Sequence, residues 1–408
     1  DRIININSPQ ERIIRYTKID NSETRFTFSS MLNSKLSNKI TLRAGVLAEN
    51  FNIENLLMHR FEQRDADGDG DPDLNTFRDI DANLMIVQPY AQGQFRLTED
   101  LTLDTGLHLQ YSSLNDQLVV EPRASIDYKM GNDHRLSFGY GVHHQNIPFP
   151  LLFLNEEVNG QTVQTNKELD FVRSQHYVLG YDVKLGSNWR GKVEVYYQDI
   201  DKAGVDSFQS SYSTLTEGAD FGFSDDRVSL VNEGTGSNKG VELTLEKFFS
   251  KGYYLLLTGS LFDAKYIGSD GIERNSPFNN RYVANLLAGK EFVLGKTNER
   301  TLFFDTRLTT SGGRYYTPID IEASREAGYE IRQNELAYSQ QYDDYLRWDF
   351  KFGMKFNRKK ASLQFYVDFQ NVTNNKNIFV TRYNRLTNNV DRVDQIGFFP
   401  DFGCKFQF

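Results

Sequence analysis

Strict alternation of apolar and polar residues is the feature that most constrains this chain. Between residues 346 and 357 alternate positions are apolar, and the positions between them are mostly charged. The apolar set is Leu346, Trp348, Phe350, Phe352, Met354 and Phe356, and the other set is Arg347, Asp349, Lys351, Gly353, Lys355 and Asn357. Successive side chains of a strand point to opposite faces, so a strand separates the two sets and a helix does not. The charged face must contact water.

The same alternation recurs along residues 189–198, 241–246 and 362–370. We count about sixteen such segments, most of roughly ten to fifteen residues, whereas a globular strand usually has about five or six. A membrane-spanning strand needs about nine to eleven residues. The pattern therefore predicts an all-β protein, an antiparallel up-and-down transmembrane β-barrel that occupies residues 1–408.

The predicted connections alternate in length. Short turns are expected near residues 21–23, 37–39, 99–100, 131–133, 186–188, 250–252, 297–299 and 358–360. Longer connections are expected at residues 59–83, 148–168, 203–236, 268–280, 312–344 and 374–393, with one short exception at 115–118. Short periplasmic turns and long extracellular loops are typical of bacterial outer-membrane barrels.

The last eight residues support the same location. They resemble the assembly signal of outer-membrane barrels, in which a polar residue, a glycine and two aromatic residues stand at fixed places. In this chain those places are taken by Asp401, Gly403, Phe406 and Phe408. The alternative is a final strand that ends in phenylalanine without any signalling role.

Composition removes several other classes of protein. The mean hydropathy is −0.56, and the sequence has no run of about 18 apolar residues, which excludes a bundle of membrane-spanning helices. The formal net charge is −9 and no basic block stands out, so no nucleic-acid partner is expected. One cysteine, Cys404, permits no intrachain disulfide. Asp1 does not begin a signal peptide, so we expect the sequence to start after processing or inside a longer protein.

Several motifs resemble the C-terminal barrel of TonB-dependent receptors, especially the large type of the Bacteroidetes. Asp368, Asn371, Val372 and Asn374 resemble the family's D-x-x-N-L-x-N motif, with valine in place of leucine. Residues 232–247 resemble its N-x-G-x-x-x-x-G-V-E-L strand entry, and Glu121, Pro122, Arg123 and Tyr128 resemble its P-R-x-x-x-x-Y strand. Residues 178–181 and 195–197 fit its paired strands. Together these motifs cover residues 122–408.

The resemblance implies a receptor that binds a scarce solute at its extracellular loops and imports it with energy from the TonB complex. The expected partners are outer-membrane lipid, a small-molecule, glycan or peptide ligand, and TonB through a plug domain. No plug or TonB-contact segment is found, and plugged barrels have 22 strands, so we expect part of a larger barrel. A sixteen-stranded passive porin and a barrel with adhesin-like loops remain alternatives. No catalytic constellation is found, so no enzyme is expected.

An acidic segment in the first long connection is the sharpest candidate site. Five carboxylates, Asp65, Asp67, Asp69, Asp71 and Asp73, occupy alternate positions around Gly70. They match the first nine places of a calcium-binding loop, although position 12 is Thr76 where a bidentate glutamate is usual. The sequence predicts a Ca²⁺ site in loop 65–76 that stiffens the loop. The alternative is a solvated acidic loop.

The candidate ligand-binding residues are weaker. His143 and His144 could bind a metal or a metal chelate, but as neighbours in a strand they should face opposite sides. Loop aromatics could stack on a planar ligand or form an interfacial girdle; they are Phe149, Phe153, Tyr315, Tyr316, Tyr338 and Tyr342. Charged residues such as Arg190, Lys192 and Glu194 could line a pathway, or could simply pair across strands.

Overall fold

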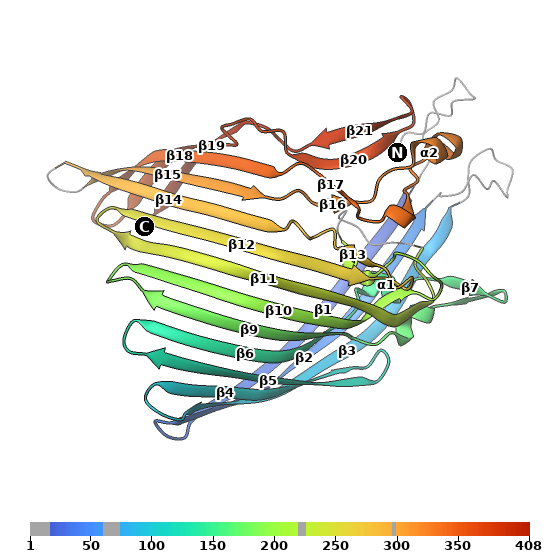
Figure 1. Cartoon of the computed structure of the whole chain (residues 1–408), viewed down its shortest axis with the longest axis horizontal. Helices are drawn as coiled ribbons and strands as arrows, with labels where there is room; N and C mark the ends of the chain where they lie inside the picture. Colours follow the sequence, from blue (N-terminus) through green and yellow to red (C-terminus); the bar gives the residue numbers. More distant parts are fainter. Residues whose placement is uncertain (1–16, 60–73, 219–225, 296–298) are drawn as a thin grey trace.

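The computed structural model describes residues 17–59, 74–218, 226–295 and 299–408, and its regular structure is almost entirely β-strand. The long strands form one antiparallel sheet in chain order (Figure 1). They are β1 (Thr17–Lys35), β2 (Ile40–His59), β3 (Asn75–Arg96), β4 (Leu101–Ser112), β5 (Gln117–Met130), β6 (His134–Gln145), β9 (Val172–Lys184), β10 (Trp189–Asp206), β11 (Leu230–Ser250), β12 (Tyr253–Ile267), β14 (Tyr282–Leu294), β15 (Arg300–Ser311), β18 (Tyr345–Asn357), β19 (Ser362–Gln370) and β22 (Phe399–Gln407). The short β13 (Glu273–Asn275) pairs with the end of β12.

The predicted alternation separates the two faces of this sheet. On the central strands the apolar set is exposed on the outer face; it includes Val120, Ile126, Phe138, Leu179, Val193, Val195, Val241 and Leu243. The intervening polar side chains lie on the inner face. An apolar outer band and a polar interior are what a transmembrane barrel wall presents to lipid and to water. The predicted fold class is therefore confirmed.

The connections sort by length as expected. Short turns join the strands at one end of the sheet, and the longer connections lie at the other end (Figure 1). One predicted turn is wrong, because residues 21–23 lie within β1, which continues to Lys35 and pairs with β2 over its whole length. Polar residues there resemble a turn, but backbone pairing with β2 overrides the local preference. The sheet thus has fifteen long strands, and sixteen when β13 is counted.

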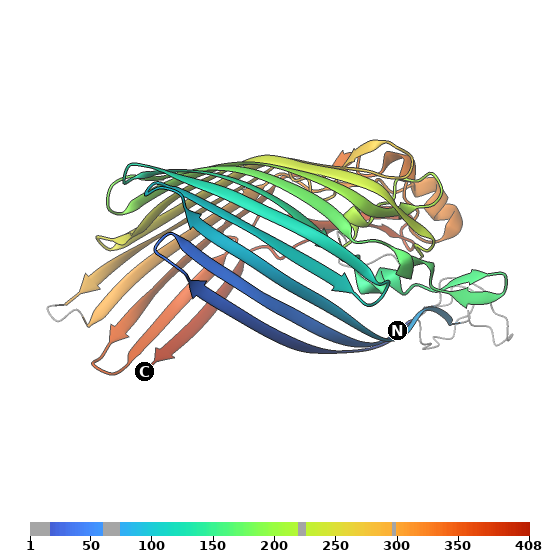
Figure 2. The same cartoon turned by 90° about the horizontal axis from the view of Figure 1, so that it is seen from below.

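The sheet curves into a trough with β1 at one edge and β22 at the other (Figure 2). Within the described residues these two strands do not pair. Strand direction alternates along the sheet, so the first and the fifteenth long strands run the same way. Antiparallel closure of a barrel requires an even number of strands, so these fifteen strands do not close on themselves. No helix among the described residues is long and apolar enough to cross a membrane.

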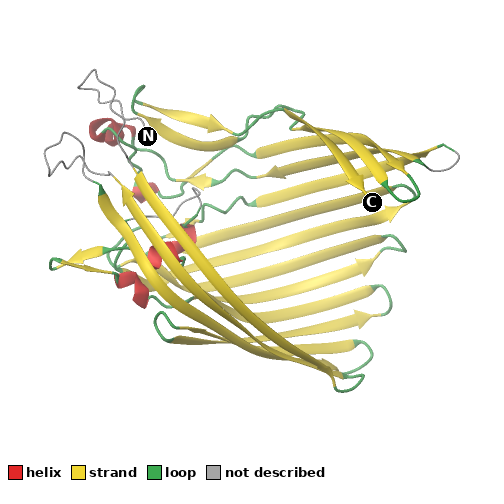
Figure 3. Cartoon of the chain, turned by 180° about the vertical axis from the view of Figure 1, so that it is seen from behind, coloured by secondary structure: helices red, strands yellow, loops and turns green. Residues whose placement is uncertain are grey.

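Short elements form a layer at the long-loop end (Figure 3). They are α1 (Phe149–Leu152), β7 (Glu156–Val158), β8 (Gln161–Val163), η1 (Thr165–Glu168), η2 (Thr214–Thr216), β16 (Tyr315–Tyr316), α2 (Ile321–Ala327), η3 (Asn334–Leu336), β17 (Gln340–Gln341), β20 (Ile378–Asn384) and β21 (Asn389–Asp394). The α2 helix begins where the Asp320 side chain accepts a hydrogen bond from the Ala323 N–H and ends at Gly328 in the left-handed conformation. Side-chain caps and C-terminal glycines of this kind stabilise helix ends.

The apolar core of the chain lies between this layer and the sheet. Phe51 of β2 and Leu84 of β3 face each other in the strand register, and both are buried. They pack with Leu151, Phe153 and Leu154 of the connection between β6 and β9. Phe51 and Arg43 are an even number of residues apart in β2, so their side chains point to the same face. That face is the polar, inner one. The connection between β6 and β9 therefore folds onto the inner wall and covers its upper part.

Candidate functional site

A row of inner-face residues crosses six adjacent strands below this covered region. Strand register aligns Arg43 with Gln92, Gln92 with Gly106, and Gly106 with Arg123. It continues from Arg123 to Gly141 and from Gly141 to His176. Because directly opposed residues of neighbouring strands point to the same face, strands β2 to β6 and β9 present this row on one continuous surface.

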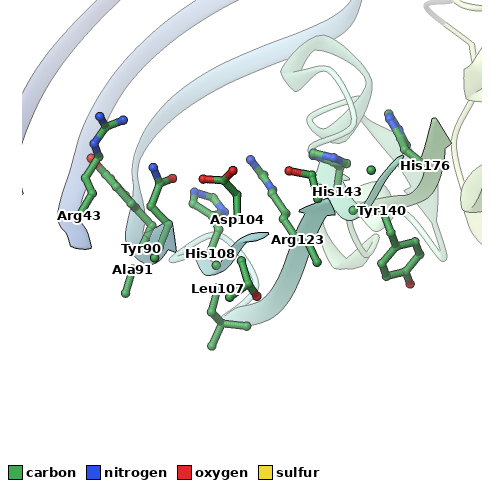
Figure 4. Close-up of a pocket in the computed structure, with 18 of the residues that line it drawn as sticks. Arg43, Tyr90, Ala91, Asp104, Leu107, His108, Arg123, Tyr140, His143 and His176 are labelled. Carbon is green, nitrogen blue, oxygen red and sulfur yellow. The ribbon is translucent and has the colours of Figure 1, made fainter. Parts of the chain in front are cut away.

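A hollow with a volume of about 710 Å³ lies along this row (Figure 4). Gly106 of β4 and both Gly139 and Gly141 of β6 are among the residues that line it, and the backbone is open above Gly139. Polar side chains rise around them; the labelled ones include Arg43, Asp104, His108, Arg123, His143 and His176. The inner wall is thus recessed where glycines replace side chains.

Glu121 accepts hydrogen bonds from several residues beside the hollow. Its carboxylate is 2 % exposed and accepts from Arg123 at 2.7 Å, from the His108 Nδ1 at 2.8 Å and from the backbone N–H of His144 at 2.6 Å. A carboxylate so deeply buried is stable only when donors of this kind compensate its lost hydration. Glu121 therefore holds Arg123 and His108 in place at the edge of the hollow.

The two candidate histidines do not act as a pair. His143 packs against His176 of β9, with ring centroids 4.6 Å apart, whereas the His144 Nδ1 lies 3.4 Å from the Glu121 carboxylate. Within the described residues no group of three metal-ligating side chains is assembled. The partner of His143 comes from a strand more than thirty residues further along. Sequence inspection missed His176 and His108, and their place on the polar face of the alternation is the one signal that could have found them.

The loop aromatics separate into two groups. Phe153 is 1 % exposed and belongs to the core, and Phe149 packs edge-on against Phe51. Tyr316 and Tyr342 stack in parallel, with centroids 4.0 Å apart, and the Tyr342 hydroxyl lies 2.9 Å from the Thr381 Oγ1. Core packing thus accounts for the phenylalanines, while the stacked tyrosines tie the connection between β15 and β18 to the one between β19 and β22.

The charged inner-face residues pair with each other, partly across strands, as the alternative interpretation expected, and partly along one strand. Arg190 bonds Asp182 on the neighbouring strand, and the Lys192 Nζ lies 2.6 Å from the Glu194 carboxylate. Asp349 is buried between Arg307 and Arg347. Such pairs compensate the charges of the inner-face side chains without any ligand.

Electrostatics also order the loop layer. The Asp270 carboxylate takes two hydrogen bonds from Arg274, at 2.9 and 2.6 Å, and these hold the pKa of Asp270 below its usual value. Burial raises the pKa of the Tyr212 phenol.

Asn166 is fully buried and its side chain forms hydrogen bonds with the backbone of Leu151, Arg227 and Leu230. These hydrogen bonds join the connection between β6 and β9 to residues 227–230 at the start of β11.

The remaining predicted sites have different outcomes. Asp65, Asp67, Asp69, Asp71 and Asp73 lie outside the described residues, although Thr76 is placed in β3. In β22, Phe402 and Phe406 are strongly exposed on one face together with Cys404. Gly403 lies opposite Tyr366 of β19. The signalling role of this motif stays a prediction.

A curved antiparallel sheet of long strands, with an apolar outer face and a polar inner one, defines the class of outer-membrane β-barrel proteins. A family model described as "TonB dependent receptor-like, beta-barrel" matches residues 4–394. The chain therefore belongs to this family, which confirms the resemblance seen in its motifs, and its location is the bacterial outer membrane. No curated protein sequence gave a significant match.

Solved structures support the fold. The outer membrane transporter YddB from Escherichia coli is 13 % identical, with a TM-score of 0.63, and the match covers 95 % of this chain and 55 % of that one. The ferric yersiniabactin uptake receptor FyuA from Yersinia pestis is 11 % identical, with a TM-score of 0.62 and coverages of 96 % and 55 %. The ferripyoverdine receptor of Pseudomonas aeruginosa is 13 % identical, with a TM-score of 0.63 and coverages of 95 % and 48 %. The chain thus spans about half the length of these proteins.

Proposed function

We propose that this chain is the larger part of the barrel of a receptor that binds a scarce, bulky solute and imports it across the outer membrane. The observation that carries the proposal is membership of the TonB-dependent receptor barrel family. A polar, recessed inner wall behind an apolar outer face is what a solute pathway requires. In the proposed mechanism a plug formed by another part of the protein gates the pathway, and the TonB complex supplies the energy.

The ligand class stays open between a small molecule, a glycan and a peptide. Two of the similar structures are described as a ferric yersiniabactin uptake receptor and a ferripyoverdine receptor, so ferric chelates are the first solutes to test. Capture would fall to the bonded loop layer, and passage to the inner wall, where His143 remains a candidate contact. His144 is held against Glu121 and is the weaker candidate. We propose no chemistry on the solute and hence no enzymatic role.

Calcium binding by loop 65–76 stays part of the proposal. Five clustered carboxylates repel each other unless a cation or solvent compensates them. The segment joins β2 to β3 at the long-loop end of the sheet, the side on which calcium would be available. Its proposed role is to stiffen the loop.

Two measurements test the proposed function. In planar bilayers the full-length protein should be closed, because a plug would fill the barrel; a steady open pore would favour the porin alternative and contradict gated uptake. In cells limited for a ferric siderophore, for cobalamin or for a glycan, deletion of the gene should abolish growth on one of these solutes. Loss of TonB should reproduce that defect, and growth independent of TonB would contradict the mechanism.

A further inference from the structure

We propose that the hollow on the inner wall binds an oxyanion group, a carboxylate or a phosphate, through Arg123, His143 and His176. The proposal rests on the proposed function, because it assigns a chemical preference to the same pathway. It follows from three features of the hollow: its donors, the shielding of its nearest carboxylate, and its bare floor.

The donors converge from three strands. Arg123 of β5, His143 of β6 and His176 of β9 all line the hollow, and their polar ends rise on one side of the sheet (Figure 4). The Arg123 side chain is 47 % exposed although one of its nitrogens is bound to Glu121. A guanidinium has five N–H donors, so donors remain that can face an oxyanion.

Glu121 does not compete with a ligand for these donors. Its carboxylate is 2 % exposed and is directed at Arg123, His108 and the His144 backbone. Since a carboxylate only accepts, the His108 Nδ1 donates its N–H to Glu121, and this donor is not available to a ligand. Glu121 is thus a positioning residue for Arg123, and the donors toward the hollow are Arg123, His143 and His176.

The bare floor lets a group come close to the wall. A Cβ placed on Gly139 would have a single neighbour within 4 Å, the Ser125 Cβ at 4.0 Å. A Cβ on Gly141 would lie 2.9 Å from the His143 Nε2. The His143 ring therefore already lies over Gly141, and the open part of the floor is at Gly139. Asp104, a half-buried carboxylate of the lining, accepts a hydrogen bond from the Gln94 amide at 3.1 Å.

The oxyanion could belong to the imported solute or to an acidic side chain of another part of the receptor. A cysteine probe distinguishes these sources in the full-length protein. Ser125 lines the hollow, and Ser125→Cys is made in a Cys404→Ser background with any cysteine outside this chain replaced. The rates of modification by an anionic and by a cationic methanethiosulfonate reagent are then compared.

We expect the anionic reagent to react at least about fivefold faster, a ratio that matches a charge interaction of about 1 kcal/mol in water. Inorganic phosphate should slow it. Arg123→Gln should bring the ratio close to one. Arg190→Gln is the matched control, because Arg190 lies on β10, is paired with Asp182 and is not part of the lining. A ratio at or below one in the otherwise unchanged protein would overturn the proposal.

If neither reagent modifies the Ser125→Cys variant in the folded protein, another part of the receptor covers the hollow. Ser125→Lys is then treated with a carbodiimide, which joins a lysine only to a carboxylate in contact. A cross-link to a carboxylate outside the barrel would support the internal source, and the absence of such a cross-link would overturn the proposal. None of these readouts depends on transport, so failure of the oxyanion site and failure of the uptake function give different results.

Discussion

The phenol ring of Tyr366 lies directly over the backbone of Gly403, across the β19–β22 strand pair at the edge of the sheet. A Cβ at position 403 would overlap this ring. The Lys351 ammonium lies over the same ring, 3.7 Å from its centroid. The glycine of the C-terminal motif therefore has a packing role in addition to any role in assembly.

Replacing Gly403 by alanine should destabilise the barrel edge. Forcing a methyl group into an occupied site costs about 1–3 kcal/mol, and here Tyr366 would have to leave Lys351. The free energy of unfolding, measured by urea titration of the full-length protein in micelles, should fall by that amount. Gly259→Ala is the control, since a Cβ there meets nothing within 4 Å. Equal effects of the two substitutions would contradict the packing role.

Deletion of Phe408 should impair insertion of the barrel. Phe408 is 98 % exposed, so its loss removes little packing, and any large effect must come from recognition of the terminal aromatic. The fraction of heat-modifiable barrel in outer-membrane preparations should decrease several-fold. Gln407→Ala changes the neighbouring exposed residue and should leave that fraction unchanged. Normal insertion of the deletion variant would count against the assembly signal.

Glu121→Gln should destabilise the inner wall. The amide presents an N–H₂ group to donors that need an acceptor, and a buried hydrogen-bonding group left unsatisfied costs about 1–3 kcal/mol. The matched change is Asp127→Asn, six residues further along β5 on the same face, where the carboxylate is less buried and pairs with the exposed Arg135; pairs near the surface contribute about 0–1 kcal/mol. In urea titrations the free energy of unfolding should fall more for Glu121→Gln than for Asp127→Asn. Similar losses would show that the hydrogen bonds of Glu121 do not stabilise the inner wall.

Removing calcium should loosen the connection between β2 and β3. EDTA should make residues 60–74 more sensitive to protease, because the five carboxylates then repel each other. The double variant Asp67→Ala with Asp69→Ala should be equally sensitive with and without EDTA. If EDTA leaves the cleavage rate of the unchanged protein as it was, the calcium site is ruled out in favour of a solvated loop.

The connection between β12 and β14 should loosen in acid. The pKa of Asp270 is lowered in the folded state by Arg274, so the carboxylate contributes stability above its unfolded pKa of about 3.9. This contribution is lost as the pH falls from there through the lower folded value. Protease cleavage within residues 268–281 should increase over that range. Asp270→Asn should already be cleaved faster at neutral pH, without the acid-dependent step at this site.

The sequence by itself determined the class of the fold and most of its order along the chain. Alternation such as that from Leu346 to Phe356 requires a strand whatever its surroundings, because the side-chain period of a strand is two. Loop lengths are also local, so the sorting of short turns from long connections could be recognised. The exception was the polar stretch at residues 21–23, where pairing with β2 decided the conformation.

Only the tertiary structure decided which inner-face residues meet. His143 and His176, or His108 and Glu121, become neighbours through strand register, and a shift of one residue would send either partner to the lipid face. The hollow likewise depends on Gly106 of β4 coming together with Gly139 and Gly141 of β6. Register is set by the sum of pairings across the whole sheet, so no single segment of the sequence contains it.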